Sequence, residues 1–180
     1  MSFIGIVSNK KCFEKVKEEL EELSKKYKNN IDDKLNLIHI TTNSIKNLKN
    51  IRFETIIIEE DLKKFVNYKN TLRVICENAK FIVINTDINK KYDDIKKNEK
   101  INITYGLNQT ADMTISSIND INMLICCQKN IQNKKGELIE IHEKRMVINK
   151  NKRLKVYEIL IIYSIFSLYG MNIMDELLEK

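Results

Sequence analysis

Polar side chains suited to ligand binding stand at the end of the most apolar stretch of this chain. Residues 80–87, KFIVINTD, predict a buried strand, and Asn85 and Asp87 lie at its carboxyl end. Ligand sites in α/β proteins lie at the carboxyl ends of the strands, so these two side chains are candidates for a binding site. Asn and Asp also cap the turns that follow strands, and this structural interpretation competes with the functional one.

A Thr-Tyr-Gly turn follows the next predicted strand. The stretch INITYGLNQTADMTISSI, residues 101–118, places Tyr105 and Gly106 between two alternating runs. Gly106 is expected to supply a positive φ, and Tyr105 to pack its ring while its hydroxyl finds a hydrogen-bond partner. The turn therefore marks the place where the α/β pattern ends.

Other residues that could bind a metal or act in catalysis lack suitable partners in the sequence. Glu59 and Glu60 follow a predicted strand, where carboxylates would suit Mg²⁺, but a solvated loop is the ordinary interpretation. His39 lies in an apolar strand and is expected to be a core histidine, whereas His142 lies among charged residues and is expected to be exposed. Neither histidine has a Ser or Cys partner at a catalytic spacing, so the sequence identifies no catalytic residue.

The cysteines indicate free thiols rather than a metal site. Cys12, Cys76, Cys126 and Cys127 show no C-x-x-C spacing. The two adjacent cysteines would point to opposite faces of a strand, which disfavours a shared metal ion. We therefore predict a cytoplasmic protein without a bound metal.

The most apolar segment is too short to cross a bilayer. Residues 159–174 contain 16 uncharged residues, fewer than the roughly 20 that a spanning helix needs. We interpret this segment as a buried core helix and expect no membrane insertion.

The elements that position these residues follow an α/β rhythm in the first half of the chain. We predict strands at residues 3–7, 35–40, 55–58 and 80–87, and helices at residues 12–27 and 61–78. Asp61 is suited to cap the second helix. The strands are apolar on both faces, which indicates an α/β fold with a mostly parallel sheet flanked by helices.

The second half of the chain has a different pattern. Period-two alternation predicts antiparallel strands, including residues 122–130 and 137–148, with a hairpin turn at Gly136. A closing helix should end at Gly170, and a short helix should follow at residues 175–179. We predict one domain, residues 1–180, made of an α/β core (1–106), a small antiparallel β extension (107–150) and C-terminal helices (151–180).

Composition limits what the positive charge means. The net charge is +6, but the chain has 27 Lys and only 4 Arg, with 30 Ile, 22 Asn and no Pro, which is typical of AT-rich coding. Recognition of phosphates and bases favours the bidentate Arg side chain. Residues 128–155 hold nine basic and three acidic residues, which we interpret as a solvated face, with nucleic-acid binding as the less favoured alternative.

The motifs at residues 80–118 resemble those of the Mur ligases, ATP-dependent enzymes that add amino acids to peptidoglycan precursors. In the central domain of that family, one buried strand ends in Asn-x-Asp-Asp, and a second ends in Thr-Tyr-Gly before an Ala-Asp pair. Here Asn85 and Asp87 match the first segment, although Ile88 replaces its second Asp. Residues 104–112, TYGLNQTAD, match the second segment. The resemblance implies a P-loop-related fold.

The resemblance also implies a nucleotide site with ATP and Mg²⁺ as cofactors. The candidate cofactor-binding residues are Asn85, Asp87, Tyr105, Lys10 and Lys11. The family binds phosphates with a G-x-x-x-x-G-K-[ST] loop, whose glycines let the backbone approach the phosphates. At the equivalent place this chain reads IGIVSNKKC, without the loop glycines and with Cys12 in place of Ser or Thr. We therefore predict that the phosphate loop is disarmed and that ATP and Mg²⁺ are not required.

Three functions remain in competition. The first is a non-catalytic Mur ligase-like domain that binds an unidentified protein partner, or a nucleotide weakly, in connection with bacterial cell-wall or spore-envelope synthesis. The second is an ATP-dependent carboxylate–amine ligase subunit completed by another chain. The third is a nucleic-acid-binding protein that uses residues 128–155. A homodimer formed through the apolar closing helix or the edge strands is also an open interpretation.

Overall fold

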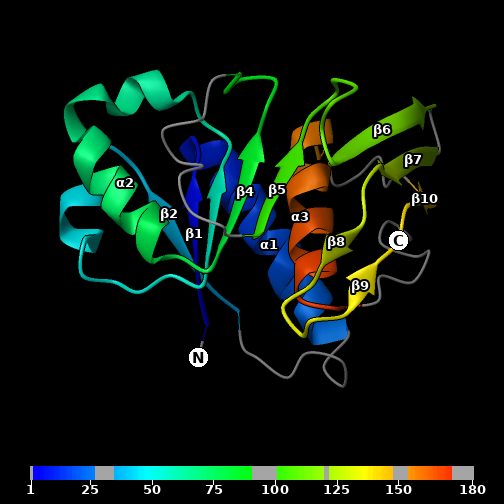
Figure 1. Cartoon of the computed structure of the whole chain (residues 1–180), viewed down its shortest axis with the longest axis horizontal. Helices are drawn as coiled ribbons and strands as arrows, with labels where there is room; N and C mark the ends of the chain where they lie inside the picture. The colour runs from blue at the N-terminus through cyan, green and yellow to red at the C-terminus, as the bar shows by residue number, and fades with distance from the viewer. Residues whose placement is uncertain (1, 27–34, 91–100, 120–121, 148–153, 172–180) are drawn as a thin grey trace.

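One eight-stranded sheet organises the residues that the structure describes (Figure 1). The structure is a computed structural model, and it describes residues 2–26, 35–90, 101–119, 122–147 and 154–171. Across the sheet the strands are ordered β10-β7-β6-β5-β4-β3-β1-β2. Their bounds are β1 Ser2–Val7, β2 Leu35–Ile40, β3 Thr55–Ile58, β4 Phe81–Asn85, β5 Ile101–Tyr105, β6 Met113–Ile118, β7 Asn122–Cys127 and β10 His142–Val147.

The sheet is parallel in its first part and antiparallel in its last. Strands β2, β1, β3, β4 and β5 pair in parallel, whereas β7 runs antiparallel to both β6 and β10. A separate hairpin pairs β8 (Ile131–Gln132) with β9 (Leu138–Ile139), and its turn contains Gly136 at a φ of 82°. These features confirm the α/β class with a mostly parallel sheet flanked by helices.

Helices cover both faces of the sheet. Helices α1 (Lys10–Lys26) and α3 (Val156–Leu168) pack against each other and against one face, where Val16 and Leu20 meet the apolar side chains of β1. Helix α2 (Lys69–Asn78) packs on the other face with the 3-10 helices η1 (Ile45–Leu48) and η2 (Leu62–Tyr68). Figure 1 shows α2 well separated from the α1–α3 pair. The strands are buried on both faces, which explains their continuous apolar runs.

Helix α3 is the central helix of the core. Its side chains are buried on all sides, including Leu160, Ile161 and Ile165, which are fully buried. The helix ends before Gly170, whose φ of 64° fits the expected left-handed cap. Among the described residues no helix is both long and apolar enough to cross a membrane. The apolar surface of α3 is buried inside the chain.

Several predicted elements differ from the structure. The helix predicted at residues 61–78 is split into η2 and α2 at Tyr68, whose φ of −122° and ψ of 14° are not helical, and η2 itself is kinked at Phe65. Asp61 nevertheless caps η2 by accepting a hydrogen bond from the Lys63 N–H at 2.9 Å. The strand predicted at residues 137–148 is interrupted between β9 and β10. The short helix predicted at residues 175–179 lies outside the described residues.

The start of the predicted antiparallel extension is also different. Strand β6 is parallel to β5, and the two strands pair only at Tyr105 and Met113. The seven residues between these strands are too few for a crossover back to the amino edge of the sheet. Strand β6 therefore begins where β5 ends and continues outward. The β6-β7-β10 strands extend the main sheet, and only the β8–β9 hairpin forms a separate antiparallel sheet.

Candidate functional site at the carboxyl edge of the sheet

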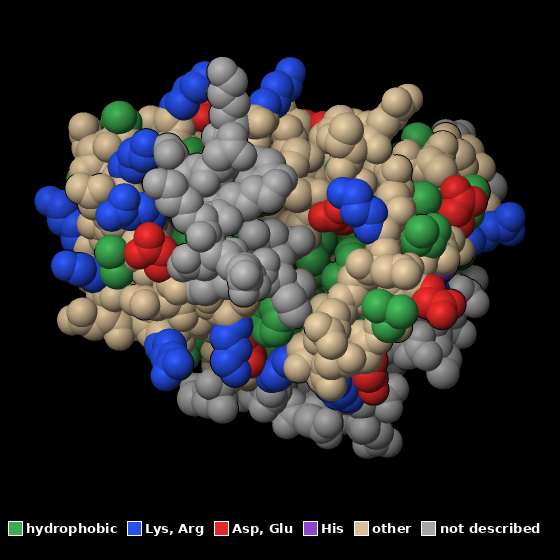
Figure 2. Space-filling model, in the orientation of Figure 1, with side chains coloured by type: hydrophobic (Ala, Val, Ile, Leu, Met, Phe, Trp, Pro, Cys, Tyr) green, Lys and Arg blue, Asp and Glu red, His purple; other side chains and the backbone are tan. Residues whose placement is uncertain are grey.

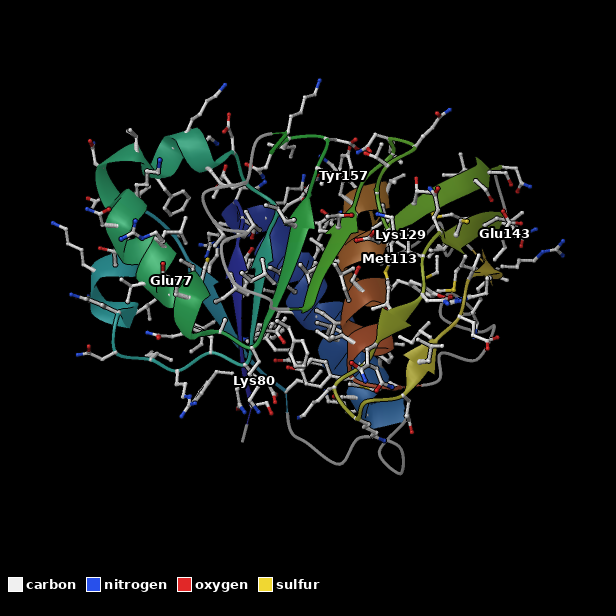
Figure 3. All side chains as sticks on the ribbon, viewed as in Figure 1. Glu77, Lys80, Met113, Lys129, Glu143 and Tyr157 are labelled. Atoms are coloured by element: carbon white, nitrogen blue, oxygen red, sulfur yellow. The ribbon has the colours of Figure 1, made fainter. Side chains whose placement is uncertain are left out.

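The strand order places a ligand crevice at one edge of the sheet. After β1 the chain moves to β2 on one side, and then returns to β3 on the other side of β1. In open α/β sheets, ligands bind outside the carboxyl ends of the strands at such a switch point. The segments that follow β1, β3, β4 and β5 all reach this edge. Figure 3 shows Tyr157, from the start of α3, above the ends of β4 and β5.

Glu59 is the centre of this edge. Its Oε2 accepts hydrogen bonds from Asn85 Nδ2 at 2.9 Å and from the Tyr105 hydroxyl at 2.5 Å. Both donors are completely buried. Burial raises the pKa of Glu59, and the nearby charges of Glu158 and Asp87 raise it further, although the two hydrogen bonds lower it. Glu59 forms no ion pair with any described residue, so its charge is held by neutral donors alone.

Tyr105 shares this perturbed environment. Burial raises the pKa of its hydroxyl well above the ordinary value, and the adjacent Glu59 carboxylate raises it further. The pair therefore favours a protonated Tyr105 that donates to Glu59, whatever the charge on Glu59. Such a hydrogen bond orients the carboxylate and fixes one of its oxygens.

Asp87 joins three segments at the same edge. Its carboxylate accepts hydrogen bonds from the Leu107 N–H at 2.5 Å, from Asn108 Nδ2 at 2.8 Å and from the Tyr157 hydroxyl at 3.0 Å. Burial alone would raise the pKa of Asp87, but these hydrogen bonds together lower it. Burial, together with the hydrogen bond to Asp87, raises the pKa of Tyr157 to about 12. Asp87 thus links the end of β4 to the Thr-Tyr-Gly turn and to α3.

The Asp87 contacts explain the glycine of the turn. A Cβ added at Gly106 would lie 2.9 Å from Asp87 Oδ2 and 2.8 Å from Asn108 Nδ2. A side chain at this position would therefore have to displace Asp87 and Asn108 from the hydrogen bonds that they form. The expectation of a positive φ at Gly106 is wrong, since only Gly136 and Gly170 have a positive φ among the described glycines. Gly106 is required for close approach and not for backbone conformation.

A second buried carboxylate holds the beginning of the turn that leads to β6. Asp112 Oδ2 accepts hydrogen bonds from the backbone N–H and the hydroxyl of Thr104 at 2.8 and 2.7 Å. Its Oδ1 lies 2.7 Å from the Nζ of Lys129. Thr104 and Asp112 therefore have a structural role, closing the segment on which Gly106 and Asn108 stand.

The amino terminus of α1 does not place the predicted lysines in this network. Lys10 and Lys11 are exposed, and Lys10 lies 3.7 Å from Glu14 one turn along the helix. The Asn9 side chain accepts a hydrogen bond from the Cys12 N–H at 3.0 Å, so it caps the helix. In a phosphate loop the backbone N–H at this place would point at the phosphate. Here the Cys12 N–H is already bonded to the Asn9 side chain.

Lys15 is the lysine that reaches the site. Its Nζ lies 3.3 Å from Oε2 of Glu158, which is buried and also accepts a hydrogen bond from the Lys155 N–H. Beside this pair, burial raises the pKa of Cys12 to about 12, and the charges of Glu59 and Glu158 contribute. A thiol with such a pKa is a poor nucleophile.

The structure therefore brings together Asn85, Asp87 and Tyr105 but leaves Lys10 and Lys11 at the surface. Sequence reasoning missed Lys15, Tyr157 and Glu158. The sequence carries a signal for Lys15 and for Glu158, but none for Tyr157. Lys15 follows Lys11 by one helical turn, and Glu158 stands at the third position of α3, where a glutamate forms a capping box.

The remaining sequence candidates have structural roles. Glu60 forms an ion pair with Lys64, and no group of three metal-ligating side chains occurs among the described residues. His39 stacks on Phe13 and its Nε2 lies 2.8 Å from the Ser8 carbonyl, but its side chain is only partly buried, so it lies at the border of the core and not within it. The expectation that His142 is exposed is wrong. Its ring is partly buried because it lies 2.6 Å from the Tyr163 hydroxyl.

Fold and site together define an open α/β protein whose polar residues gather at a topological switch point. No protein-family model matches this chain, and no curated protein sequence matches it.

Proposed function

We propose that this chain is a non-catalytic domain related to the central domain of Mur ligases, and that it binds a partner protein at the carboxyl edge of its sheet. One observation carries the proposal. The polar groups at this edge bind one another, since Glu59 is held by Asn85 and Tyr105 while Asp87 is held by its own three donors. An edge arranged in this way is suited to present a fixed surface.

The outer rim of the edge supports protein binding in particular. Ile88 and Leu107 are 40% and 53% exposed. Ile88 follows Asp87, and the Asp87 carboxylate accepts the hydrogen bond of the Leu107 N–H, so this bond joins the two segments that carry the apolar side chains. Exposed apolar side chains around a rigid polar centre are typical of protein interfaces. A role beside cell-wall or spore-envelope synthesis is what the Mur ligase resemblance suggests.

The expected compartment rests on the cysteines. All four thiols are free, and three of them are buried, which favours a reducing environment such as the cytoplasm.

Site-specific photo-crosslinking in cells tests the proposed surface. A photoreactive amino acid replaces Leu107 in one variant and Ile141 in a control variant, because both are exposed apolar residues and Ile141 lies on the β9–β10 connection. We expect a discrete crosslinked protein from position 107 and none of the same mass from position 141. Equal products from both positions, or no product from 107, would contradict the proposal.

Nucleotide binding is the second candidate function, favoured by the lysines near the end of β1. Thermal unfolding with millimolar Mg·ATP measures it, because a ligand that binds the native state raises the melting temperature. We expect no rise. A rise that Lys15→Gln or Lys11→Gln abolishes, together with hydrolysis of ATP, would favour the ligase-subunit alternative instead.

The basic segment gives little support to nucleic-acid binding. Within its described part, Lys129 and Lys134 are engaged by Asp112 and Glu54. Figure 2 shows Lys, Arg, Asp and Glu side chains interspersed on the visible face. Such mixing weakens the uniform positive potential that phosphate binding requires.

A further inference from the structure

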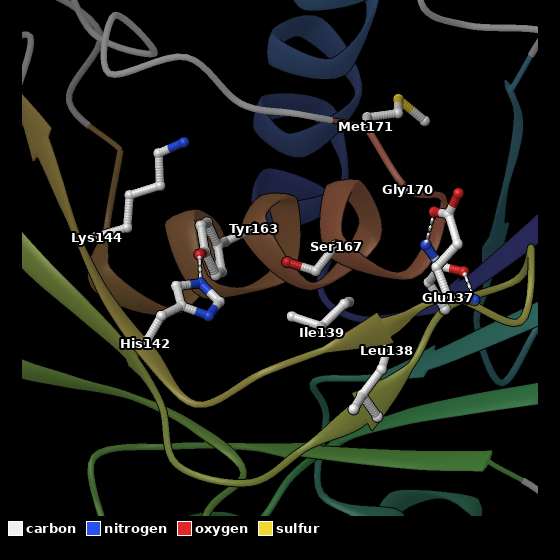
Figure 4. A pocket seen from close by; sticks show the side chains of 10 residues that line it. Glu137, Leu138, Ile139, His142, Lys144, Tyr163, Ser167, Gly170 and Met171 are labelled. Carbon is white, nitrogen blue, oxygen red and sulfur yellow. Dashed lines mark hydrogen bonds between the residues drawn. The ribbon is translucent and has the colours of Figure 1, made fainter.

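A pocket lies away from the carboxyl edge, beside the second half of α3 (Figure 4). Its volume is about 440 Å³, within the roughly 300–1,000 Å³ typical of small-molecule sites. Three elements form it: the β8–β9 hairpin, the start of β10 and the end of α3. Tyr157 at the beginning of α3 belongs to the carboxyl edge, whereas Ser167 near its end lines the pocket. The two sites are therefore separate.

Opposite charges lie at the two ends of the pocket. Figure 4 shows Lys144 at one end and Glu137 at the other. Asn133 donates a hydrogen bond to Glu137 Oε2 at 2.7 Å, which orients the carboxylate. Among the described residues no carboxylate forms an ion pair with Lys144. A molecule that fills the length of the pocket would therefore have a cation at one end and an anion at the other.

The middle of the pocket combines apolar surface with a few polar atoms. Ile139, Met171 and the Tyr163 ring provide the apolar part, and the Ser167 hydroxyl lies one helical turn beyond Tyr163. Tyr163 is only 3% exposed, and burial is the main cause that raises its pKa to about 12. Its hydroxyl therefore stays protonated at neutral pH.

The His142–Tyr163 pair has a defined direction. His142 Nδ1 lies 2.7 Å from the Glu140 carbonyl, which can only accept, so Nδ1 carries the proton. In the neutral ring Nε2 is then an acceptor, and the Tyr163 hydroxyl donates to it across 2.6 Å. The Tyr163 oxygen also accepts a hydrogen bond from the Ser167 side chain, so the acceptor that remains for an N–H group of a ligand is the Ser167 hydroxyl oxygen, which lines the pocket.

We propose that this pocket binds a small zwitterion of dipeptide size, with its carboxylate at Lys144 and its ammonium group at Glu137. The peptide N–H would donate to the Ser167 hydroxyl, and the side chains would lie on Ile139 and Met171. This site is additional to the carboxyl edge and does not depend on the function proposed there.

Titration of the ¹⁵N-labelled full chain with alanyl-leucine tests the proposal by NMR. The same dipeptide is used with its amine acetylated, with its carboxyl amidated and with both ends blocked. We expect saturable shifts of the amides around Ile139 and Ser167 for the zwitterion. Blocking either end should weaken binding by about tenfold or more, because each blocked end loses a charge-assisted hydrogen bond.

Matched variants locate the charges. Lys144→Gln and Glu137→Gln should each weaken binding of the zwitterion by about tenfold. Arg145→Gln and Glu143→Gln are the controls, since these exposed neighbours do not line the pocket, and they should leave binding unchanged. The proposal is overturned if the doubly blocked peptide binds as well as the zwitterion, if the controls weaken binding equally, or if no pocket amide shifts at millimolar dipeptide.

Discussion

Two glutamates bracket the same buried strand, and the protein treats them in opposite ways. Glu54 precedes β3 and Glu59 follows it. Glu54 lies 3.1 Å from the Nζ of Lys134 and accepts a hydrogen bond from the Tyr169 hydroxyl at 3.2 Å. Burial tends to raise its pKa, but hydrogen bonds from Ser2 and Lys134 and the charge of Lys134 outweigh burial and lower it. Glu59 has only neutral donors, and its pKa is raised.

The two carboxylates thus differ in what holds them: Glu54 has a cation beside it, and Glu59 has only neutral donors among the described residues. At the amino edge, Lys134 connects Glu54 to Ser2 and lies over the Tyr169 ring, so it fastens the β8–β9 connection and the end of α3 to β3. At the carboxyl edge, Glu59 lies near the carboxylates of Asp87 and Glu158, and no cation in the described part of the chain forms an ion pair with it. Neighbouring carboxylates without a cation lower the stability of the folded state, and such unfavourable arrangements are typical of functional sites.

Removing the cation at the amino edge should have the largest effect. Lys134→Met leaves Glu54 only the exposed Lys80, whose Nζ lies 3.9 Å from Oε1, as a cation. We expect the free energy of unfolding to fall by about 2 kcal/mol, because a charge-assisted hydrogen bond to a mostly buried carboxylate is lost. Urea unfolding followed by circular dichroism measures the change. Lys63→Met is the control, because Lys63 is exposed, and it should cost far less. Equal urea midpoints for the two variants would contradict the structural role of Lys134.

Removing the charge at the carboxyl edge should have a smaller effect of the opposite sign. In Glu59→Gln the amide oxygen still accepts from Asn85 and Tyr105, while the desolvated charge is gone. We expect the protein to gain about 1 kcal/mol at pH 7. Glu60→Gln serves as the matched control, since Glu60 is paired with Lys64 and should gain nothing. A loss of stability in Glu59→Gln would show that Glu59 is as structural as Glu54.

The same contrast shows what sequence alone can predict. Strands β1 to β5, helix α1, the Asp61 cap and the Gly170 terminus follow from local periodicity and local residue preferences, and they were predicted close to their observed positions. The Lys134–Glu54 contact joins residues 80 positions apart, and no local pattern announces it.

The residues of the candidate site also differ in whether local sequence can predict them. Asn85 and Asp87 were found because a strand end is visible in the sequence. Lys10 and Lys11 were chosen for their closeness to the end of β1, but the helical turn places Lys15 at the site instead. Tyr157 reaches Asp87 from 70 positions away, which only the packing of α3 determines.

The contributions of Glu54 and Glu59 to stability should depend on pH in opposite directions. A raised pKa in the folded state means that Glu59 contributes most at low pH, and that its contribution is lost as the pH rises from about 4.5 through the raised pKa. A lowered pKa means that Glu54 contributes above its ordinary value of 4.5, and that this is lost as the pH falls through the lowered pKa.

Urea unfolding between pH 3 and pH 8 checks both directions. The advantage of Glu59→Gln over the unmodified chain should appear above about pH 4.5 and vanish below it. Glu54→Gln should show the reverse, with its deficit disappearing at low pH. Parallel pH curves for the two variants would refute the assignment of opposite roles.

Thiol reactivity gives the smallest and most local test of the carboxyl edge. Cys12 is 6% exposed, and burial raises its pKa to about 12, so it should resist a disulfide reagent at pH 8 in the native state. Cys126 is partly exposed and should react first, while buried Cys76 and Cys127 serve as internal controls. Mass spectrometry of the labelled peptides reports each site. If Cys12 reacted as fast as Cys126, the edge around Glu59 would open in solution, and a closed, neutral-donor site could no longer explain the raised pKa of that carboxylate.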